Sequence, residues 1–172
     1  MKQIKKYEER RQGLVDLIMA LSRVENKSTG SRYVWAVAIE KAWRKLDDCH
    51  TSFRGYGKYL GHPVWSKAAL KLLTENGGIC NKLVTDKLSH EHVVPLNYRI
   101  RAVFMGLPST ITAEEIGELI DFYGAVAIIT KEEDKSLHRT KMPTGWDKTI
   151  DSTSNIYARY TAGGIFDNLE FN

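Results

Sequence analysis

The chain has few of the residues that cross-link or interrupt a fold. It contains two cysteines and four prolines among its 172 residues. Cys49 and Cys80 belong to no Cys-x-x-Cys pair, so we expect free thiols in a reducing compartment and no structural zinc held by paired cysteines. The packing of apolar side chains must therefore hold the core together.

Long apolar runs are also missing. No stretch approaches the roughly 18 consecutive apolar residues that indicate a membrane-spanning helix. The N-terminal residues are charged, and no hydrophobic signal region follows them before the charged residues at 8–11. We therefore expect a cytoplasmic protein without a membrane span.

The composition is that of an ordinary globular domain, with 42% hydrophobic and 27% charged residues. The length suits one domain, or a core with a helical extension, and is sufficient to bury a proper core. The net charge of +4 favours a polyanionic partner only weakly, because many basic proteins bind no nucleic acid.

The first half of the chain predicts three helices. Apolar residues recur at helical spacing over about residues 4–25 and again over 35–46, where they form a broad stripe. The tryptophans of the second helix lie on that stripe, so we expect them to pack against the first helix rather than stack on bases. Pro63 at a first-turn position and Gly77 after the last turn bound the third helix.

Residues 53–59 mix aromatic, basic and glycine residues in a loop. Arg54 and Lys58 in this loop suit a surface that follows phosphates while aromatic rings stack on bases. A packed loop anchored by its aromatic rings explains the same composition, and we favour that interpretation. His50 and His62 lie in loops and are assigned no role.

The most informative segment is 89–95, where Glu91 and His92 are followed by two strand-forming valines and by Pro95, which ends the strand. Neighbouring side chains on a strand point to opposite faces of the sheet. The pair can therefore direct one group to a metal ion and the other to a substrate water. Residues 79–86 predict a further strand that pairs with this one as a hairpin.

A second segment combines a strand with a helix. The apolar run 124–130 has the length of a strand, and 131–139 predicts a helix. Thr130 and Glu133 form a capping box at the start of that helix, because each side chain can satisfy a backbone N–H of the other residue.

Two more helices are expected between these strands, over 96–105 and 112–123, the second with a capping box of Thr112 and Glu115. A turn-rich segment and a less regular tail follow residue 140. No internal repeat or low-complexity tract is present.

The order of a strand ending in Glu-His, a connection, a strand and a short helix resembles that of the His-Asn-His (HNH, ββα-metal) endonuclease family. The resemblance covers about residues 78–146. It implies that His92 is the general base and that Glu91 and Asp134 hold a metal ion. His138, four residues after Asp134 and thus on the same face of the expected helix, would be a further ligand or a phosphate contact. Asp134 stands where the family usually has a histidine.

The resemblance implies a metal-dependent endonuclease that hydrolyses phosphodiester bonds in DNA, with RNA the weaker alternative, in restriction, phage defence or a mobile element. One Mg²⁺ or Mn²⁺ would relieve charge on the phosphate and on the leaving oxygen. A homodimer is expected if the target is palindromic. The candidate nucleic-acid contacts are Arg54, Lys58, Arg99, Arg139 and Lys141.

We therefore predict an α+β fold with a helical region over 1–77, a ββα-metal core with a helical insertion over 78–146, and a C-terminal tail over 147–172 packed on the core. Two other classes of protein stay open. One is a non-catalytic nucleic-acid-binding protein with a degenerate HNH-like site, and the other is a helical interaction module that needs no metal. A histidine bonded to a neighbouring acid at a strand end also occurs in inert proteins.

Overall fold

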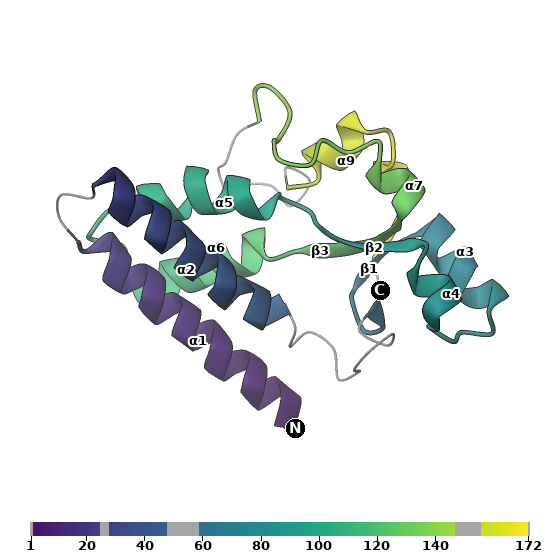
Figure 1. Cartoon of the computed structure of the whole chain (residues 1–172), viewed down its shortest axis with the longest axis horizontal. Coiled ribbons are helices and arrows are strands. Elements are labelled where there is room, and N and C mark those ends of the chain that lie inside the picture. Colours follow the sequence, from purple (N-terminus) through teal and green to yellow (C-terminus); the bar gives the residue numbers. More distant parts are fainter. Residues whose placement is uncertain (1, 25–27, 48–58, 147–155, 172) are drawn as a thin grey trace.

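The computed structural model describes residues 2–24, 28–47, 59–146 and 156–171, and its elements form a helical layer beside a small sheet (Figure 1). Helices α1 (Lys2–Ser22) and α2 (Thr29–Asp47) run antiparallel and contact each other. α6 (Ala113–Tyr123) packs on α1, and α5 (Leu96–Ala102) packs on α2. Two long helices were expected in this part of the chain, and both are confirmed.

The sheet has four strands in the order β2-β3-β1-β4. Strand β1 pairs in parallel with β3, whereas the β2–β3 and β1–β4 pairs are antiparallel. The bounds of the strands are Val64–Ser66 for β1, Leu88–His92 for β2, Val126–Thr130 for β3 and Leu169–Phe171 for β4. The architecture is therefore α+β, as predicted, and its sheet takes strands from all three of the predicted regions.

Two cores cover the two faces of the sheet. The larger core joins Ala127 and Ile129 of β3 to the helical layer, and it includes Trp43, which packs with Leu14 and Ile18 of α1 as expected. The smaller core covers the opposite face, where Ile128 of β3 packs with residues of α3 (Lys67–Glu75) and α4 (Lys82–Thr85). The other short helices within the described ranges are η2 (Phe104–Gly106), α7 (Lys131–Asp134), α9 (Ala158–Ala162) and η3 (Phe166–Asn168).

Two predicted elements are wrong, and one strand was not predicted. The strand expected over 79–86 is instead α4, capped by the Asn81 side chain, which accepts the N–H of Val84; the antiparallel partner of β2 is β3. The third helix starts after Ser66 rather than at Pro63, because residues 64–66 are buried as a strand between two others. The tail contributes strand β4, which the sequence did not predict.

The junction between β3 and α7 confirms the predicted capping box and corrects the helix that follows it. Glu133 accepts hydrogen bonds from the backbone N–H of Thr130 (2.8 Å) and from the hydroxyl of Ser66 (2.6 Å), so it also ties α7 to the end of β1. The helix ends at Asp134 instead of continuing to 139. The Ser136 hydroxyl donates to the carbonyl of Glu133, and Leu137 turns into the larger core.

We expect Glu133→Ala to lower the free energy of unfolding by about 1–2 kcal/mol, because it removes both the cap and the link to Ser66. Chemical denaturation of the variant and the wild type measures this difference. Glu132→Ala is the matched control, since Glu132 is exposed and, among the residues that the structure describes, pairs only with Lys135 three residues away. Equal losses in the two variants would contradict the capping role.

No helix within the described residues has both the length and the apolar character needed to cross a membrane.

Candidate functional site

His92 and Asp47 form a hydrogen-bonded pair at the place where the sheet meets the helical layer. His92 is the last residue of β2, and Asp47 is the last residue of α2. The two side chains join through Nε2 of His92 and Oδ2 of Asp47 at 2.8 Å, and they are only 17% and 9% exposed. A histidine at a strand end is thus held by a buried carboxylate from an element 45 residues earlier.

The electrostatics of this pair keep Asp47 ionised. Burial by itself raises the pKa of the Asp47 carboxyl, but the hydrogen bond and charge of His92, with weaker contributions from Arg99 and His90, lower the pKa below its usual 3.8. An ionised carboxylate only accepts hydrogen bonds, so Nε2 of His92 must carry the proton. In neutral His92, Nδ1 is then the atom that can accept a proton.

The lowered pKa makes the contribution of Asp47 to stability depend on pH. Because the pKa is lower in the folded state, this contribution is present above the unfolded value of 3.8 and is lost as the pH falls through the folded pKa. We expect the difference in unfolding free energy between wild type and Asp47→Asn to narrow between about pH 5 and pH 2. Denaturation at a series of pH values measures it. In a His92→Ala background this difference should change less with pH, because the contact that does most to lower the Asp47 pKa is gone.

A pair of histidines, His62 and His90, lies beside the His92–Asp47 pair. His90 is two residues before His92 and therefore on the same face of β2, with the two ring centroids 5.9 Å apart. Its Nε2 lies 3.2 Å from Nε2 of His62, and these two rings meet edge to face with centroids 4.6 Å apart. His62 is 4% exposed and comes just before β1. Three imidazoles and one carboxylate thus gather at one end of the sheet.

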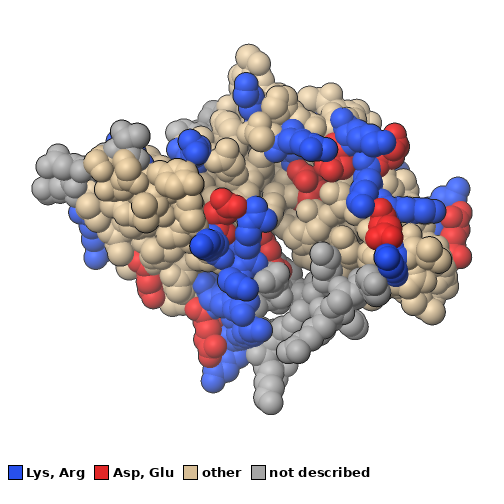
Figure 2. All heavy atoms as spheres, in the orientation of Figure 1, with Lys and Arg blue, Asp and Glu red and all other residues tan. Residues whose placement is uncertain are grey.

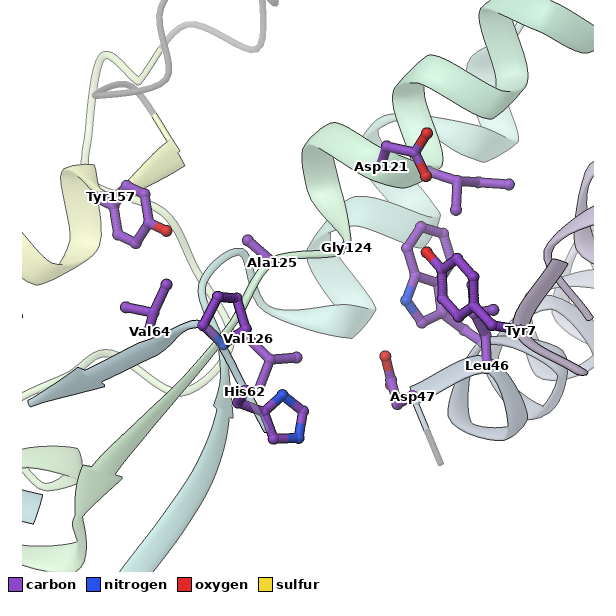
Figure 3. Close-up of a pocket in the computed structure, with 13 residues that line it drawn as sticks. Tyr7, Leu46, Asp47, His62, Val64, Asp121, Gly124, Ala125, Val126 and Tyr157 are labelled. Carbon is purple, nitrogen blue, oxygen red and sulfur yellow. The ribbon is translucent and has the colours of Figure 1, made fainter. Parts of the chain in front are cut away.

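A cavity of about 260 Å³ opens between the helical layer and this end of the sheet. Figure 3 shows Asp47 with Tyr7 on its helical side, and His62 with Val64 and Tyr157 on the side of the sheet. Asp47 and His62 project toward the space between the two sides (Figure 3). The cavity gives a small ligand or ion access to Asp47 of the His92–Asp47 pair and to His62 of the His62–His90 pair.

Glu91 points to the opposite face of the sheet, as the alternation of a strand requires. Its Oε1 accepts a hydrogen bond from Nη2 of Arg159 at 2.5 Å. The same guanidinium donates to the carbonyl of His92 at 2.5 Å and to the carbonyl of His138 at 2.8 Å. Arg159 is 2% exposed and comes from α9, in the C-terminal part of the chain.

The predicted metal site is therefore organised around a guanidinium. Glu91 is neutralised by Arg159, and the His138 side chain is exposed, with its Nδ1 accepting the N–H of Thr140. Asp134 and His138 share no helical face, because α7 ends at Asp134. Arg159 thus occupies the Glu91 carboxylate that the prediction assigned to a metal ion. Nowhere in the described ranges does a set of three or more His, Cys, Asp or Glu side chains have an arrangement that could hold a metal ion.

The predicted nucleic-acid contacts divide into three groups. The prediction that Arg99 contacts nucleic acid is wrong, because this side chain is fully buried. Its guanidinium stacks over Trp43 at 3.9 Å and donates a hydrogen bond to the carbonyl of Tyr123. Burial lowers the pKa of Arg99 to about 9, so it stays charged at pH 7. Arg139 and Lys141 are exposed after α7, and the predicted contacts at 54 and 58 lie outside the described residues.

Sequence reasoning missed Asp47, His62 and Arg159 as members of these clusters. Each lies far along the chain from β2, and no spacing links it to the Glu-His motif. The available signal was chemical: a strand-end histidine and glutamate need partners once they are buried, and an acid and an arginine are the residues that satisfy them.

Comparisons of the chain with protein-family models, with curated proteins and with solved structures found no match.

Proposed function

We propose that the protein is an endonuclease that hydrolyses phosphodiester bonds in DNA, with His92 as its general base. The observation that carries this proposal is the 2.8 Å hydrogen bond between His92 and Asp47 at the end of β2. The antiparallel β2–β3 pair followed by α7 keeps the strand, strand and helix order on which the resemblance to HNH nucleases rests.

The pair can activate water in two ways. Asp47 fixes the imidazole in the form whose Nδ1 accepts a proton, so His92 can deprotonate a water molecule. As the imidazolium forms, the negative charge of Asp47 stabilises it without Asp47 becoming protonated. The divalent ion that the resemblance implies does not fit Glu91, Asp134 and His138 as they lie, and we assign it no step there.

Charge on the helical layer supports a polyanionic substrate. Figure 2 shows Lys and Arg side chains gathered over α1 and the C-terminal half of α2, the helix that ends in Asp47. The exposed lysines of this basic surface include Lys5, Lys6, Lys41 and Lys45. Phosphate contacts to such a surface would make binding weaken as salt is raised. A cytoplasmic setting in restriction, phage defence or a mobile element belongs to the same proposal.

A second candidate function is non-catalytic nucleic-acid binding at a degenerate site. Arg159 favours it, because this side chain neutralises Glu91 at the place where a catalytic metal ion was expected. The basic surface would serve either function.

Incubation with supercoiled plasmid separates the two candidates. The purified protein is tested with Mg²⁺, Mn²⁺, Zn²⁺ or EDTA, and binding to a labelled duplex is measured in parallel at two salt concentrations. Nicked or linear product supports the endonuclease. Salt-dependent binding without any cleavage supports the binding protein, and the absence of both contradicts both proposals.

A further inference from the structure

An open groove of about 350 Å³ lies between α2 and the end of α5. It is lined by Arg32, Tyr33 and Ala36 of α2, by Arg101 of α5 and by Met105 of η2. The side chains of the two arginines and of Tyr33 are exposed. Among the described residues that line the groove none is acidic, so it places two positive charges beside apolar side chains.

The two groove arginines have no carboxylate partner in the part of the chain that the structure describes. Two other arginines of the helical layer do pair with carboxylates, Arg11 with Asp121 and Arg44 with Glu40. Arg101 donates through Nε to the uncharged side chain of Asn97 at 2.8 Å, and the Arg32 guanidinium has no partner within the described ranges. Two guanidinium groups that line one groove without a counterion give it a charge that suits an anion.

The groove lies on the same side of α2 as Asp47. Fifteen residues, a little over four helical turns, separate Arg32 from Asp47, so the two side chains project from one side of the helix about 22 Å apart along its axis. Trp43 is on this side as well, and Arg99 of α5 stacks on its ring, which shows that α5 packs there. The groove and the His92–Asp47 pair therefore occupy the two ends of one helix face.

We propose that this groove binds the sugar-phosphate backbone of a nucleic-acid strand, with Arg32 and Arg101 on one phosphate group. The planar guanidinium presents paired N–H donors that match phosphate oxygens. A volume of about 350 Å³ equals that of about 12 water molecules, which is more room than one phosphate needs. Tyr33 and Met105 offer apolar surface to the sugar that the phosphate carries.

The choice of nucleic acid as the ligand rests on the proposed function, to which the groove adds a second contact. One strand of a duplex advances about 3.4 Å per nucleotide, so a phosphate held here would lie about six nucleotides from a phosphate at the His92–Asp47 pair. A contact of this kind positions a strand without reading its sequence. The groove would thus set how the strand is placed relative to His92.

Binding of the full chain to a fluorescein-labelled 20-base-pair duplex, followed by anisotropy at several salt concentrations, tests the proposal. Loss of one phosphate contact lowers the salt slope of the affinity by about 0.9, which is about 8-fold in affinity at 0.1 M salt. We therefore expect Arg32→Gln combined with Arg101→Gln to weaken binding about 5–10-fold at 0.1 M salt and to lower the slope by about one. Each single variant should weaken binding about 2–5-fold. Both side chains are exposed, so the variants should fold.

The matched control is Lys82→Gln, which removes one exposed positive charge from α4, on the opposite face of the sheet. Its affinity should stay within twofold of the wild type. The proposal is overturned if the double variant binds the duplex as the wild type does, or if Lys82→Gln loses as much affinity as the single groove variants. Calorimetry with inorganic phosphate tests the source of the anion, because phosphate binding as tight as that of the duplex would assign the groove to a free anion instead of a strand.

This experiment separates the groove from the proposed activity, because its readout is binding and not cleavage. Groove variants that bind weakly, together with a wild type that cuts no plasmid, would support the groove and contradict the endonuclease. Plasmid cleavage with unchanged binding by the groove variants would do the reverse. A wild type that binds no duplex at any salt concentration would overturn the groove proposal as well.

Discussion

His92→Ala should reduce plasmid cleavage by about 10²–10⁴-fold, the contribution that a positioned general base makes. We expect this loss of activity because His92, at the end of β2, is the histidine that is hydrogen-bonded to Asp47. Initial rates of nicking, measured with equal amounts of folded protein, give the size of the effect. Circular dichroism of the variant shows whether the loss arises from unfolding.

The controls for this prediction separate His92 from its neighbours. Asp47→Asn should also lower the cleavage rate, because the amide no longer fixes the imidazole in the required tautomer. His138→Ala should leave the rate nearly unchanged, since this exposed side chain takes no part in the cluster. Equal cleavage by wild type and His92→Ala would mean that a contaminant or another site performs the reaction.

Arg159→Met should lower the free energy of unfolding by about 3–5 kcal/mol, the usual cost of removing one partner of a buried ion pair. Glu91 is 20% exposed and would keep a charge with no counterion, and the carbonyls of His92 and His138 would lose their donor. Urea denaturation of both proteins measures the change. Arg139→Met, at an exposed arginine, should change stability by no more than about 0.5 kcal/mol.

A double variant tests whether the Glu91 charge causes this loss. Arg159→Met combined with Glu91→Gln should recover part of the lost stability, because the uncompensated charge is gone. If instead the double variant is as unstable as the single one, the cost comes from the backbone carbonyls alone. Arg159→Met also exposes the predicted metal site to test, since Mg²⁺ should stabilise this variant only if Glu91 can act as a ligand.

The parts of the fold that sequence predicted are those fixed by local chemistry. α1 and α2 follow from apolar spacing, and the capping boxes at Thr112 and Thr130 place the starts of α6 and α7 correctly. The end of α7 was wrong because a distant core accepts Leu137 and bends the chain away from the helix. Strand β1 was read as a helix start because its three residues are too few to show a periodic pattern.

The candidate site was predictable only in those parts that local chemistry fixes. The sequence indicated that Glu91 and His92 would face opposite sides of the sheet, and they do contact different partners. It could not indicate which partners, because Asp47 and Arg159 reach β2 only through the packing of α2 and α9. Arg99 was wrongly placed on the surface, since charge alone does not reveal that Trp43 and a backbone carbonyl hold it in the core.

The position of β4 has a consequence for the order of folding. β1 lies inside the sheet only because β4 pairs with its outer edge, and that pairing joins Val64 to Phe171, more than one hundred residues along the chain. Contacts of such long range close slowly, whereas the α1–α2 hairpin is local. During synthesis the helical layer can form early, while the outer edge of β1 is unpaired and able to pair with another chain until β4 has been made. A nascent or truncated chain lacking β4 is therefore the form of this protein most prone to self-association.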